Sequence, residues 1–413
     1  MDAFIIDAVR TPRAIGKAPK GALSHLHPHR LGSTVLRALA ERNDIDTSHV
    51  DDVIWGTSVQ RGLQGHNLGR MAALEAGFDE RSSGMTLDRF CGTGITTVSL
   101  GAAQVMSGME DLVVCGGSEM MSHTRIHPEL VGNTQLDSEN LVLRAQHPQS
   151  QQGVSADAIA TLERIDRTAV DALAVTSQVR ADMAIKEGRF HNAIVPVLND
   201  DGSVALDRDE FPRPGTTADT LASLPAIFKR VARAEIGPDG ATFGDMIYQK
   251  YPDLRDKMTW VHHAGNASGI VDGAGAVLLA SERYSERNRL KPRARVVATA
   301  NIGDCPTLML NAPVPAIRKV LDKAGLSIAD IDVFEINEAF AVVPEKAIRD
   351  LNLDRSKVNI NGGAIALGHP IGATGAILIG TALDELERSG GRYALITMCA
   401  AGGMAPAIII ERL

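Results

Sequence analysis

The chain has 413 residues, a formal net charge of −8, 44% hydrophobic residues and 22% charged residues. At about 150 residues per domain, this length predicts two or three domains, and the composition excludes intrinsic disorder over most of the chain. An acidic balance with only 4% aromatic residues argues against a nucleic-acid surface, which normally combines a basic excess with aromatic stacking platforms.

The cysteines and the N-terminus indicate the cellular compartment. No CxxC pair is formed by the four cysteines, Cys91, Cys115, Cys305 and Cys399. This spacing suits neither a disulfide scaffold nor a zinc site, so we expect reduced thiols and no metal. The first seven residues carry acids where a secretory signal would carry bases, and no apolar run approaches the roughly 18 residues of a spanning helix. The sequence therefore predicts a cytoplasmic protein without a transmembrane segment.

In the first half of the chain, strands and helices alternate around a pair of glycines. Residues 3–9 predict a buried strand, residues 31–42 a helix and residues 50–55 a second strand. After the segment Cys91-Gly92-Thr93-Gly94, apolar residues recur at helical spacing as far as residue 106, and residues 112–115 predict another strand. Strand, glycine turn, helix and strand within about 30 residues is typical of a βαβ unit.

The middle of the chain has a different character. Residues 146–152 are rich in amides, residues 200–209 are acidic and turn-like, and proline–glycine breakers follow. Two helices are predicted around them, near residues 156–187 and 220–234. We interpret residues 123–260 as an inserted loop domain.

The first pattern then returns. The second half predicts, in order, a strand at 295–300, a helix at 315–324, a strand at 331–336, a glycine-rich turn at 362–375, a helix to about 388 and a strand at 393–398. The repeated order indicates a duplicated α/β domain. We therefore expect an N-terminal half, residues 1–122 with 261–289, the loop domain at 123–260 and a C-terminal half at 290–413.

Cys91 lies where a predicted strand gives way to a helix, among glycines. The positive end of the helix would stabilise a thiolate and lower the thiol pKa below its usual value. Glycines would let a substrate carbonyl approach backbone N–H groups. On position alone, Cys91 is equally consistent with a small buried side chain, an interpretation that suits Cys115 and Cys305 better.

His369 is framed by five glycines ahead of a helix. A neutral imidazole there can deprotonate a thiol or donate a hydrogen bond to a thioester oxygen. A phosphate-binding turn is the alternative, but neither GxGxxG nor GxxxxGK[ST] is present. Two further polar junctions follow strands, one at Asn337 and one at Cys399, so four such junctions occupy equivalent ends of the repeated units.

With these motifs in place, the chain resembles the thiolases along nearly its whole length. The resemblance rests on six motifs in family order: Arg89-Phe90-Cys91-Gly92-Thr93-Gly94, Gly116-Gly117-Ser118-Glu119-Met120-Met121-Ser122, Ala264-Gly265-Asn266-Ala267-Ser268-Gly269, Asn337-Glu338-Ala339-Phe340, Gly368-His369-Pro370 and Cys399 with its glycines. The chain is most similar to the thiolase (β) subunit of bacterial fatty-acid β-oxidation trifunctional complexes. That closer likeness rests on Pro148-Gln149-Ser150, the longer insert before Trp260, and His262 and His263.

The resemblance implies a fold, an activity and partners. The fold would be two duplicated βαβαβαββ halves in a five-layered α-β-α-β-α core, with an inserted loop domain. The activity would be that of an acetyl-CoA C-acyltransferase or C-acetyltransferase, which cleaves 3-ketoacyl-CoA with CoA to acetyl-CoA and a shortened acyl-CoA, or runs the reverse Claisen condensation. Coenzyme A would be a substrate, with no permanently bound cofactor. A homodimer or homotetramer is implied, and an enoyl-CoA hydratase/3-hydroxyacyl-CoA dehydrogenase subunit is a further partner that the resemblance suggests.

The resemblance also gives roles to four side chains. Cys91 would be the nucleophile that carries the acyl group as a thioester, and His369 would activate it. Cys399 would exchange a proton with the acetyl-CoA carbon. Asn337 would hold a water in an oxyanion hole beside His369. Two cysteines and a histidine supply the thiolate and the carbon acid/base that thiolysis requires.

The resemblance also implies two contacts with coenzyme A, and the sequence departs from the family pattern at two places. Ser268 would lie near the pantetheine, and Arg213 near the nucleotide end. Ala401 stands where most thiolases have a glycine whose N–H serves the second oxyanion hole. Alanine keeps that N–H but tolerates a positive φ less well. Gln151 and Gln152 stand where short-chain biosynthetic relatives often carry His-Met near the acyl pocket, so acyl-chain preference does not carry over from them.

Two other functions are disfavoured. A condensing enzyme of the ketoacyl-synthase kind would usually have a second histidine in place of Cys399. A catalytically silent acyl-CoA-binding subunit would be expected to have lost Cys91 or His369, and both are present.

Overall fold

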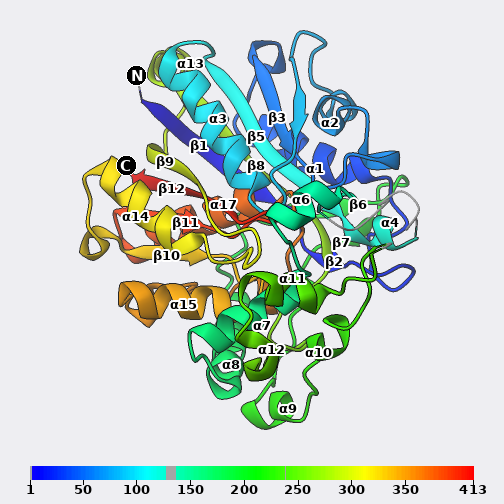
Figure 1. The fold of residues 1–413 in the computed structure, drawn as a ribbon. Helices are drawn as coiled ribbons and strands as arrows, with labels where there is room; N and C mark the ends of the chain where they lie inside the picture. The colour runs from blue at the N-terminus through cyan, green and yellow to red at the C-terminus, as the bar shows by residue number, and fades with distance from the viewer. Residues whose placement is uncertain (1, 127–135, 238) are drawn as a thin grey trace.

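The computed structural model describes residues 2–126, 136–237 and 239–413. Its strands form one ten-stranded sheet in the order β10-β11-β12-β9-β1-β8-β5-β3-β4, with β2 paired to β8 (Figure 1). The strands are β1 (Ala3–Arg10), β2 (Ala14–Ile15), β3 (Asp52–Gly56), β4 (Met85–Leu87), β5 (Leu112–Met120), β8 (Val271–Ser281), β9 (Ala294–Gly303), β10 (Val333–Ile336), β11 (Tyr393–Thr397) and β12 (Met404–Arg412).

Strand pairing repeats between the two halves of this sheet. In the first half, β4, β3 and β5 are parallel, and β8 and β1 continue the sheet antiparallel. In the second half, β10 and β11 are parallel, and β12 and β9 continue antiparallel. A parallel bridge between Phe334 and Val358 takes the place that β4 has in the first half. The halves join through two residue pairs between β1 and β9, and the predicted duplicated α/β fold is confirmed.

Helices form the other layers of the predicted five-layered core. They are α1 (Pro28–Arg42) and α2 (Leu68–Ala76) over the first half, α14 (Pro313–Ala324) and α15 (Val342–Leu351) over the second, and α3 (Thr93–Ser107) and α17 (Thr374–Ser389) between them. One buried cluster joins Val98 of α3 and Leu383 of α17 to Val277 and Ile408 of the two half-sheets. The central helices are therefore apolar on most sides, as buried helices are.

Two glycines set the distance between the central helices. A Cβ added at Gly94 would lie 2.7 Å from the backbone nitrogen of Ala376, and one at Gly375 would lie 2.1 Å from that of Ile95. The first turns of α3 and α17 thus touch backbone to backbone. Because Cys91 precedes α3 and His369 precedes α17, this contact brings the two predicted catalytic loops together.

The helices of the middle segment differ in detail from the prediction. They are α4 (Met121–Ile126), α6 (Leu141–Gln146), α7 (Gln152–Leu162), α8 (Arg167–Lys186), α9 (Ala218–Ala222), α10 (Phe228–Val231), α11 (Phe243–Lys250) and α12 (Leu254–Lys257), with a small hairpin of β6 (Val197–Leu198) and β7 (Val204–Leu206). The single helix expected near 156–187 is two, because Arg164 has a left-handed φ of +52° and Asp166 caps α8. In place of the helix expected at 220–234, the structure has two short helices, α9 and α10.

The boundaries proposed for the three domains stay a prediction.

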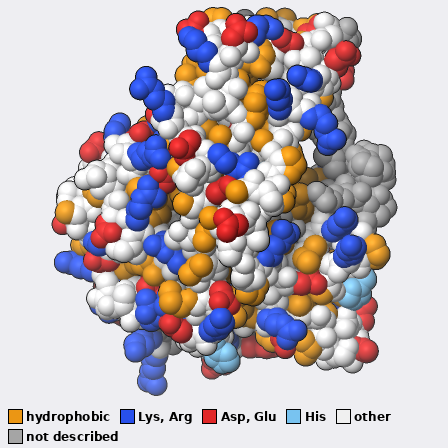
Figure 2. Space-filling model, turned by 90° about the horizontal axis from the view of Figure 1, so that it is seen from below, with side chains coloured by type: hydrophobic (Ala, Val, Ile, Leu, Met, Phe, Trp, Pro, Cys, Tyr) orange, Lys and Arg blue, Asp and Glu red, His pale blue; other side chains and the backbone are white. Residues whose placement is uncertain are grey.

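The other α-helices of the described residues are α13 (Glu282–Asn288) and the single turn α16 (Ala364–Leu367) inside the glycine-rich segment. In the described ranges of the chain, every helix falls short of the length or the apolar character needed to cross a bilayer. On the face seen in Figure 2, basic and acidic side chains are interspersed.

Candidate active site

A strained turn presents Cys91 at the start of α3. Phe90 has a φ of +50°, a left-handed conformation that side-chain-bearing residues seldom adopt. Its N–H donates to Asp88 Oδ1 at 2.6 Å. The Thr93 hydroxyl accepts from the Arg89 N–H at 2.8 Å and donates to the Phe90 carbonyl at 2.5 Å. These bonds hold the half-buried Cys91 thiol in place.

The electrostatics of Cys91 differ from the prediction. Burial raises the pKa of its thiol to about 12, and the carboxylates of Glu119 and Asp88 act in the same direction. The expected lowering of the thiol pKa is therefore not found, and the loss of hydration on burial is the largest cause of the raised value. The resting nucleophile is therefore a thiol that needs a base.

His369 is buried, and its hydrogen bonds define its tautomer. Its Nδ1 lies 2.6 Å from the hydroxyl oxygen of Thr374, and that hydroxyl donates its only hydrogen to the Pro370 carbonyl at 3.1 Å. With the hydroxyl hydrogen assigned to the Pro370 carbonyl, the imidazole proton is assigned to Nδ1, and Nε2 is the nitrogen that can accept a proton. Burial and the nearby charge of Arg13 lower the pKa of His369 to about 3. The imidazole is therefore neutral at pH 7, with Nε2 unprotonated.

Asn337 lies next to Nε2 of His369. Its Nδ2 is 3.5 Å from His369 Nε2, and its N–H donates to the Thr397 carbonyl at 3.1 Å. Its Oδ1 is buried and has no hydrogen-bond partner in the described part of the protein. A buried polar atom of this kind normally pairs with a water or a ligand.

Cys399 follows β11 and is fully buried. Burial raises the pKa of its thiol, and the neighbouring Cys91 raises it further, so the two sulfurs belong to one site. Ala401, which would tolerate a positive φ less well than the usual glycine, does not have a positive φ. The left-handed residues of this loop are Gly402 and Gly403. Alanine therefore presents its N–H there without backbone strain.

The two residues expected to contact coenzyme A lie on neighbouring loops. Ser268 donates its N–H to the Ala339 carbonyl at 3.0 Å. The Arg213 N–H donates to Gln178 Oε1 at 2.9 Å, and its guanidinium stacks 5.0 Å from the centre of the Phe211 ring. A Cβ on Gly269 would lie 2.2 Å from that same ring. The loop of Ser268 therefore packs against the segment that carries Arg213.

A cavity of about 820 Å³ opens beside Cys91. It is lined by Ser58, Val59, Gln60, Arg61, Asp88, Phe90, Cys91, Leu136, Ser138, Gln149, Ser150, Gln151, Gln152, Phe243, Met309, Ile371 and Ala401. Its volume falls in the range of small-molecule sites. Part of the predicted loop domain therefore meets the nucleophile across this space.

Glu119 is a structural residue whose role the sequence did not reveal. Its buried carboxylate accepts hydrogen bonds from Ser58 N at 2.8 Å, from the side chains of Thr57 and Gln64, and from Gly372 N at 3.0 Å. It ties β5 to the loop that carries His369. An acid inside an otherwise apolar strand was the available signal.

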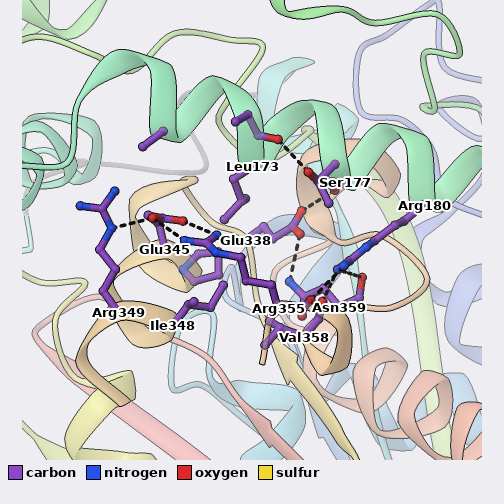
Figure 3. Close-up of a pocket in the computed structure, with 14 residues that line it drawn as sticks. Leu173, Ser177, Arg180, Glu338, Glu345, Ile348, Arg349, Arg355, Val358 and Asn359 are labelled. Atoms are coloured by element: carbon purple, nitrogen blue, oxygen red, sulfur yellow. Dashed lines mark hydrogen bonds and ion pairs between the residues drawn. The ribbon is translucent and has the colours of Figure 1, made fainter. Parts of the chain in front are cut away.

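A second pocket, of about 480 Å³, lies between α8 and α15 (Figure 3). At its base, the Glu338 carboxylate accepts from Ser177 Oγ at 2.6 Å and Asn359 Nδ2 at 2.9 Å. Burial raises the pKa of Glu338. Since Glu338 follows Asn337 directly, this network anchors the strand end that supports His369.

The two other cysteines differ from one another. Cys115 is buried in β5, as expected. Cys305 is half-buried, and its sulfur lies 3.3 Å from Lys250 Nζ and 3.4 Å from the Tyr251 hydroxyl. The expectation that Cys305 only fills core space is therefore wrong. Among the described residues, no cluster of three histidine, cysteine or acidic side chains is arranged to hold a metal.

Family models decide the identity. One described as "Thiolase, N-terminal domain" matches residues 3–234, and one described as "Thiolase, C-terminal domain" matches residues 290–412. The chain belongs to the thiolase family. The predictions of a thiolase and of a thiolase fold are confirmed.

Relatives named for different thiolase activities match this thiolase over its whole length. "Steroid 3-ketoacyl-CoA thiolase FadA6" of Mycobacterium tuberculosis is 40% identical, over 100% of this chain and 94% of the relative. "Beta-ketoadipyl-CoA thiolase" of Acinetobacter baylyi is 38% identical, over 99% of both chains. "Acetyl-CoA acetyltransferase" of Shinella zoogloeoides is 36% identical, over 100% of this chain and 99% of the relative. The crystal structure of the Bacillus anthracis acetyl-CoA acetyltransferase superposes with a TM-score of 0.81 at 33% identity, over 100% of this chain and 99% of that one.

Proposed function

We propose that this thiolase cleaves 3-ketoacyl-CoA with CoA through an acyl thioester on Cys91. The observation that carries the proposal is the contact of His369 Nδ1 with the Thr374 hydroxyl, which also bonds to the Pro370 carbonyl; it supports a tautomer in which Nε2 can accept a proton. The low pKa of His369 and the high pKa of Cys91 keep both groups neutral at rest. The proton therefore moves as the sulfur attacks.

In the first half-reaction, Cys91 Sγ bonds to the 3-keto carbon, and its proton goes to His369 Nε2. The oxyanion is stabilised by that protonated nitrogen and by a water on Asn337. The bond between C2 and C3 breaks, and the acetyl-CoA carbanion takes its proton from Cys399. Acetyl-CoA leaves, and the acyl group stays on Cys91.

In the second half-reaction, the thiol of CoA gives its proton to the Cys399 thiolate and its sulfur attacks the thioester. The Cys91 thiolate leaves and recovers its proton from His369. The products are acetyl-CoA and an acyl-CoA that is two carbons shorter. The N–H of Ala401, free of backbone strain, supports its assignment as a donor for the second oxyanion.

Ser268 and Arg213 are our candidates for contacts with the pantetheine and the nucleotide end of CoA. Their loops pack together, and Arg213 lines a hollow of about 210 Å³ with Ala264 and Gly265. CoA serves as a substrate, and the mechanism uses no permanently bound cofactor.

The physiological setting is a further part of the proposal. We propose degradative thiolysis, as in fatty-acid β-oxidation, in the cytoplasm. The names of the relatives extend the candidate substrates to steroid-derived and ketoadipyl thioesters. A homodimer or homotetramer, with or without a hydratase/dehydrogenase subunit, is proposed on the family resemblance and is tested by sedimentation of the isolated chain.

Steady-state thiolysis of acetoacetyl-CoA tests the reaction. The wild type should consume it in the presence of CoA, and Cys91→Ala should show essentially no turnover. Cys115→Ala, which removes a thiol remote from the cavity, is the matched control and should retain activity. Equal rates in the wild type and Cys91→Ala would refute the proposed mechanism.

A further inference from the structure

A buried arginine contacts the loop that carries His369. Arg13 lies between β1 and β2, and only 3% of its surface is exposed. Its Nη1 donates to the Gly368 carbonyl at 3.1 Å, and that carbonyl belongs to the peptide group that leads into His369. The N–H of the same peptide group donates to the Gly269 carbonyl at 2.8 Å. Both ends of the peptide group ahead of the imidazole are therefore held.

The backbone of Arg13 is held by the segment that follows β7. Its N–H donates to Asp209 Oδ1 at 2.9 Å, and its carbonyl accepts from the Glu210 N–H at 2.9 Å. Asp209 is in turn bound by the guanidinium of Arg10, which donates to its two carboxylate oxygens at 2.7 and 2.8 Å. The Arg13 side chain therefore starts from a fixed backbone, and the nearby carboxylate of Asp209 is already paired with another arginine.

The charge of Arg13 has no hydrogen-bonded carboxylate among the described residues. Its Nε is buried and finds no hydrogen-bond partner there. Burial and the charge of Arg10 lower the pKa of Arg13 to about 10, so the side chain is still a cation at pH 7. The other ionisable groups that face it are Asp209, Glu335 and Glu338. Burial raises the pKa of both glutamates, which weakens them as counter-ions. A buried cation without a close anion costs folding free energy, which points to a use beyond stability.

The charge of Arg13 acts on the imidazole of the catalytic pair and not on its thiol. Burial lowers the pKa of His369, and Arg13 acts in the same direction because a cation opposes a second positive charge nearby. The pKa of Cys91 responds to burial and to the carboxylates of Glu119 and Asp88. Arg13 thus affects the two partners of the proton transfer differently.

We propose that Arg13 is a positioning residue of this site, whose guanidinium holds the peptide group ahead of His369 and places a fixed positive charge near the imidazole. The inference rests on the proposed thiolysis through Cys91. The hydrogen bond to Gly368 keeps His369 Nε2 beside Asn337, 3.5 Å from its Nδ2. The charge disfavours the imidazolium, so His369 takes the proton of Cys91 only as the sulfur attacks and returns it when the thiolate leaves.

Three substitutions separate the hydrogen bond from the charge. Arg13→Lys keeps a charge and a donor, Arg13→Gln keeps a donor alone, and Arg13→Met keeps neither. The kcat and KM of acetoacetyl-CoA thiolysis are measured between about pH 4 and pH 8. In Arg13→Met, kcat should fall by about tenfold or more with little change in KM, because the imidazole is less well oriented. The acid limb of kcat should move up by about one pH unit in Arg13→Gln and Arg13→Met, and Arg13→Lys should keep it near the wild-type position.

Two further measurements distinguish this role from a structural one. Arg293→Met removes another largely buried arginine, with a side chain 19% exposed, that pairs with Asp384 of α17. It should keep the wild-type acid limb whatever it does to stability. NMR of isotope-labelled histidine follows the protonation of His369 without substrate, with its signal identified by its loss in His369→Gln. Its titration midpoint should rise in Arg13→Gln by the same amount as the acid limb.

The outcomes are decided by the pH dependence. An acid limb and an NMR midpoint that stay at the wild-type values in Arg13→Gln and Arg13→Met would overturn the inference, as would an equal shift in Arg293→Met. If Arg13→Met does not fold, the comparison of Arg13→Lys with Arg13→Gln decides. A wild type that is inert towards acetoacetyl-CoA would refute the proposed reaction, and the NMR titration would still test the effect of Arg13 on His369.

Discussion

Thr374 fixes the proton on His369 Nδ1 and so determines which nitrogen faces the reaction. The hydroxyl is committed to the Pro370 carbonyl and accepts from the imidazole at 2.6 Å. This orientation is a property of the loop ahead of α17. A single hydroxyl therefore sets which imidazole nitrogen can accept the proton, much as an orienting carboxylate does in other histidine sites.

Replacing that hydroxyl should damage turnover more than binding. In Thr374→Val, the buried Nδ1–H loses its acceptor, and the tautomer with Nε2 protonated becomes competitive. We expect kcat for acetoacetyl-CoA thiolysis to fall by about 10²-fold or more, as is usual for a general base, with a smaller change in KM. Thr374→Ser keeps the hydroxyl and should restore most of the rate. Equal kcat in Thr374→Val and the wild type would contradict this role for the hydroxyl.

Asp272 makes the stability of the protein depend on pH. Its buried carboxylate is bonded to Ser122 N at 2.8 Å and to Ser122 Oγ, yet burial raises its pKa to about 6 from an ordinary 3.8. Because the folded-state pKa is the higher one, the folded protein binds this proton more tightly. The stabilisation is complete below about pH 4 and is lost as the pH rises through 6.

Asp272→Asn should remove this pH dependence. The amide keeps an oxygen that can accept from Ser122 N, and it carries no charge. Between about pH 4 and pH 8, the free energy of unfolding of the wild type should fall by about 2–3 kcal/mol relative to the variant. Urea unfolding at a series of pH values measures this difference. If the free energy of unfolding of the wild type minus that of the variant stays constant or increases as the pH rises, the assignment is contradicted.

At the scale of elements, the contact between α3 and α17 connects the two catalytic loops. Gly94 and Gly375 are the positions where the helix backbones touch. The abundance of glycine and the scarcity of aromatic residues in the sequence are consistent with such close contacts. The site depends on this crossing because each of the two helices follows one catalytic residue.

The substitution Gly94→Ala should therefore strongly reduce both stability and activity. Its Cβ would meet the backbone of α17 at 2.7 Å, which no side-chain rotation can relieve. We expect destabilisation of about 1–3 kcal/mol from overpacking, together with a loss of thiolysis larger than the loss of folded protein. Gly303→Ala is the control, because nothing lies within 4 Å of the added Cβ. Thermal unfolding and thiolysis rates of both variants test the prediction. If Gly94→Ala and Gly303→Ala have similar stability and activity, the close contact between α3 and α17 is contradicted.

At the scale of the whole molecule, the sequence predicted the duplicated fold and the loops that carry Cys91, His369, Asn337 and Cys399. These features depend on local patterns: alternating strands and helices, glycine turns and short motifs. Other properties depend on distant contacts. The raised pKa of Cys91 follows from burial by the assembled halves, and the network around Glu119 joins segments more than 200 residues apart in the chain. The break between α7 and α8 was missed because Arg164, a residue without strong turn preference, adopts a left-handed conformation there.

Trapping the acyl-enzyme tests the central claim most directly. The protein is incubated with acetoacetyl-CoA in the absence of free CoA, quenched in acid and digested, and the peptides are analysed by mass spectrometry. The account predicts an acetyl group on the peptide that contains Cys91, its removal when CoA is added before the quench, and none in Cys91→Ser. Acetylation confined to Cys305 or Cys399, or thiolysis with no acyl group on Cys91, would contradict it.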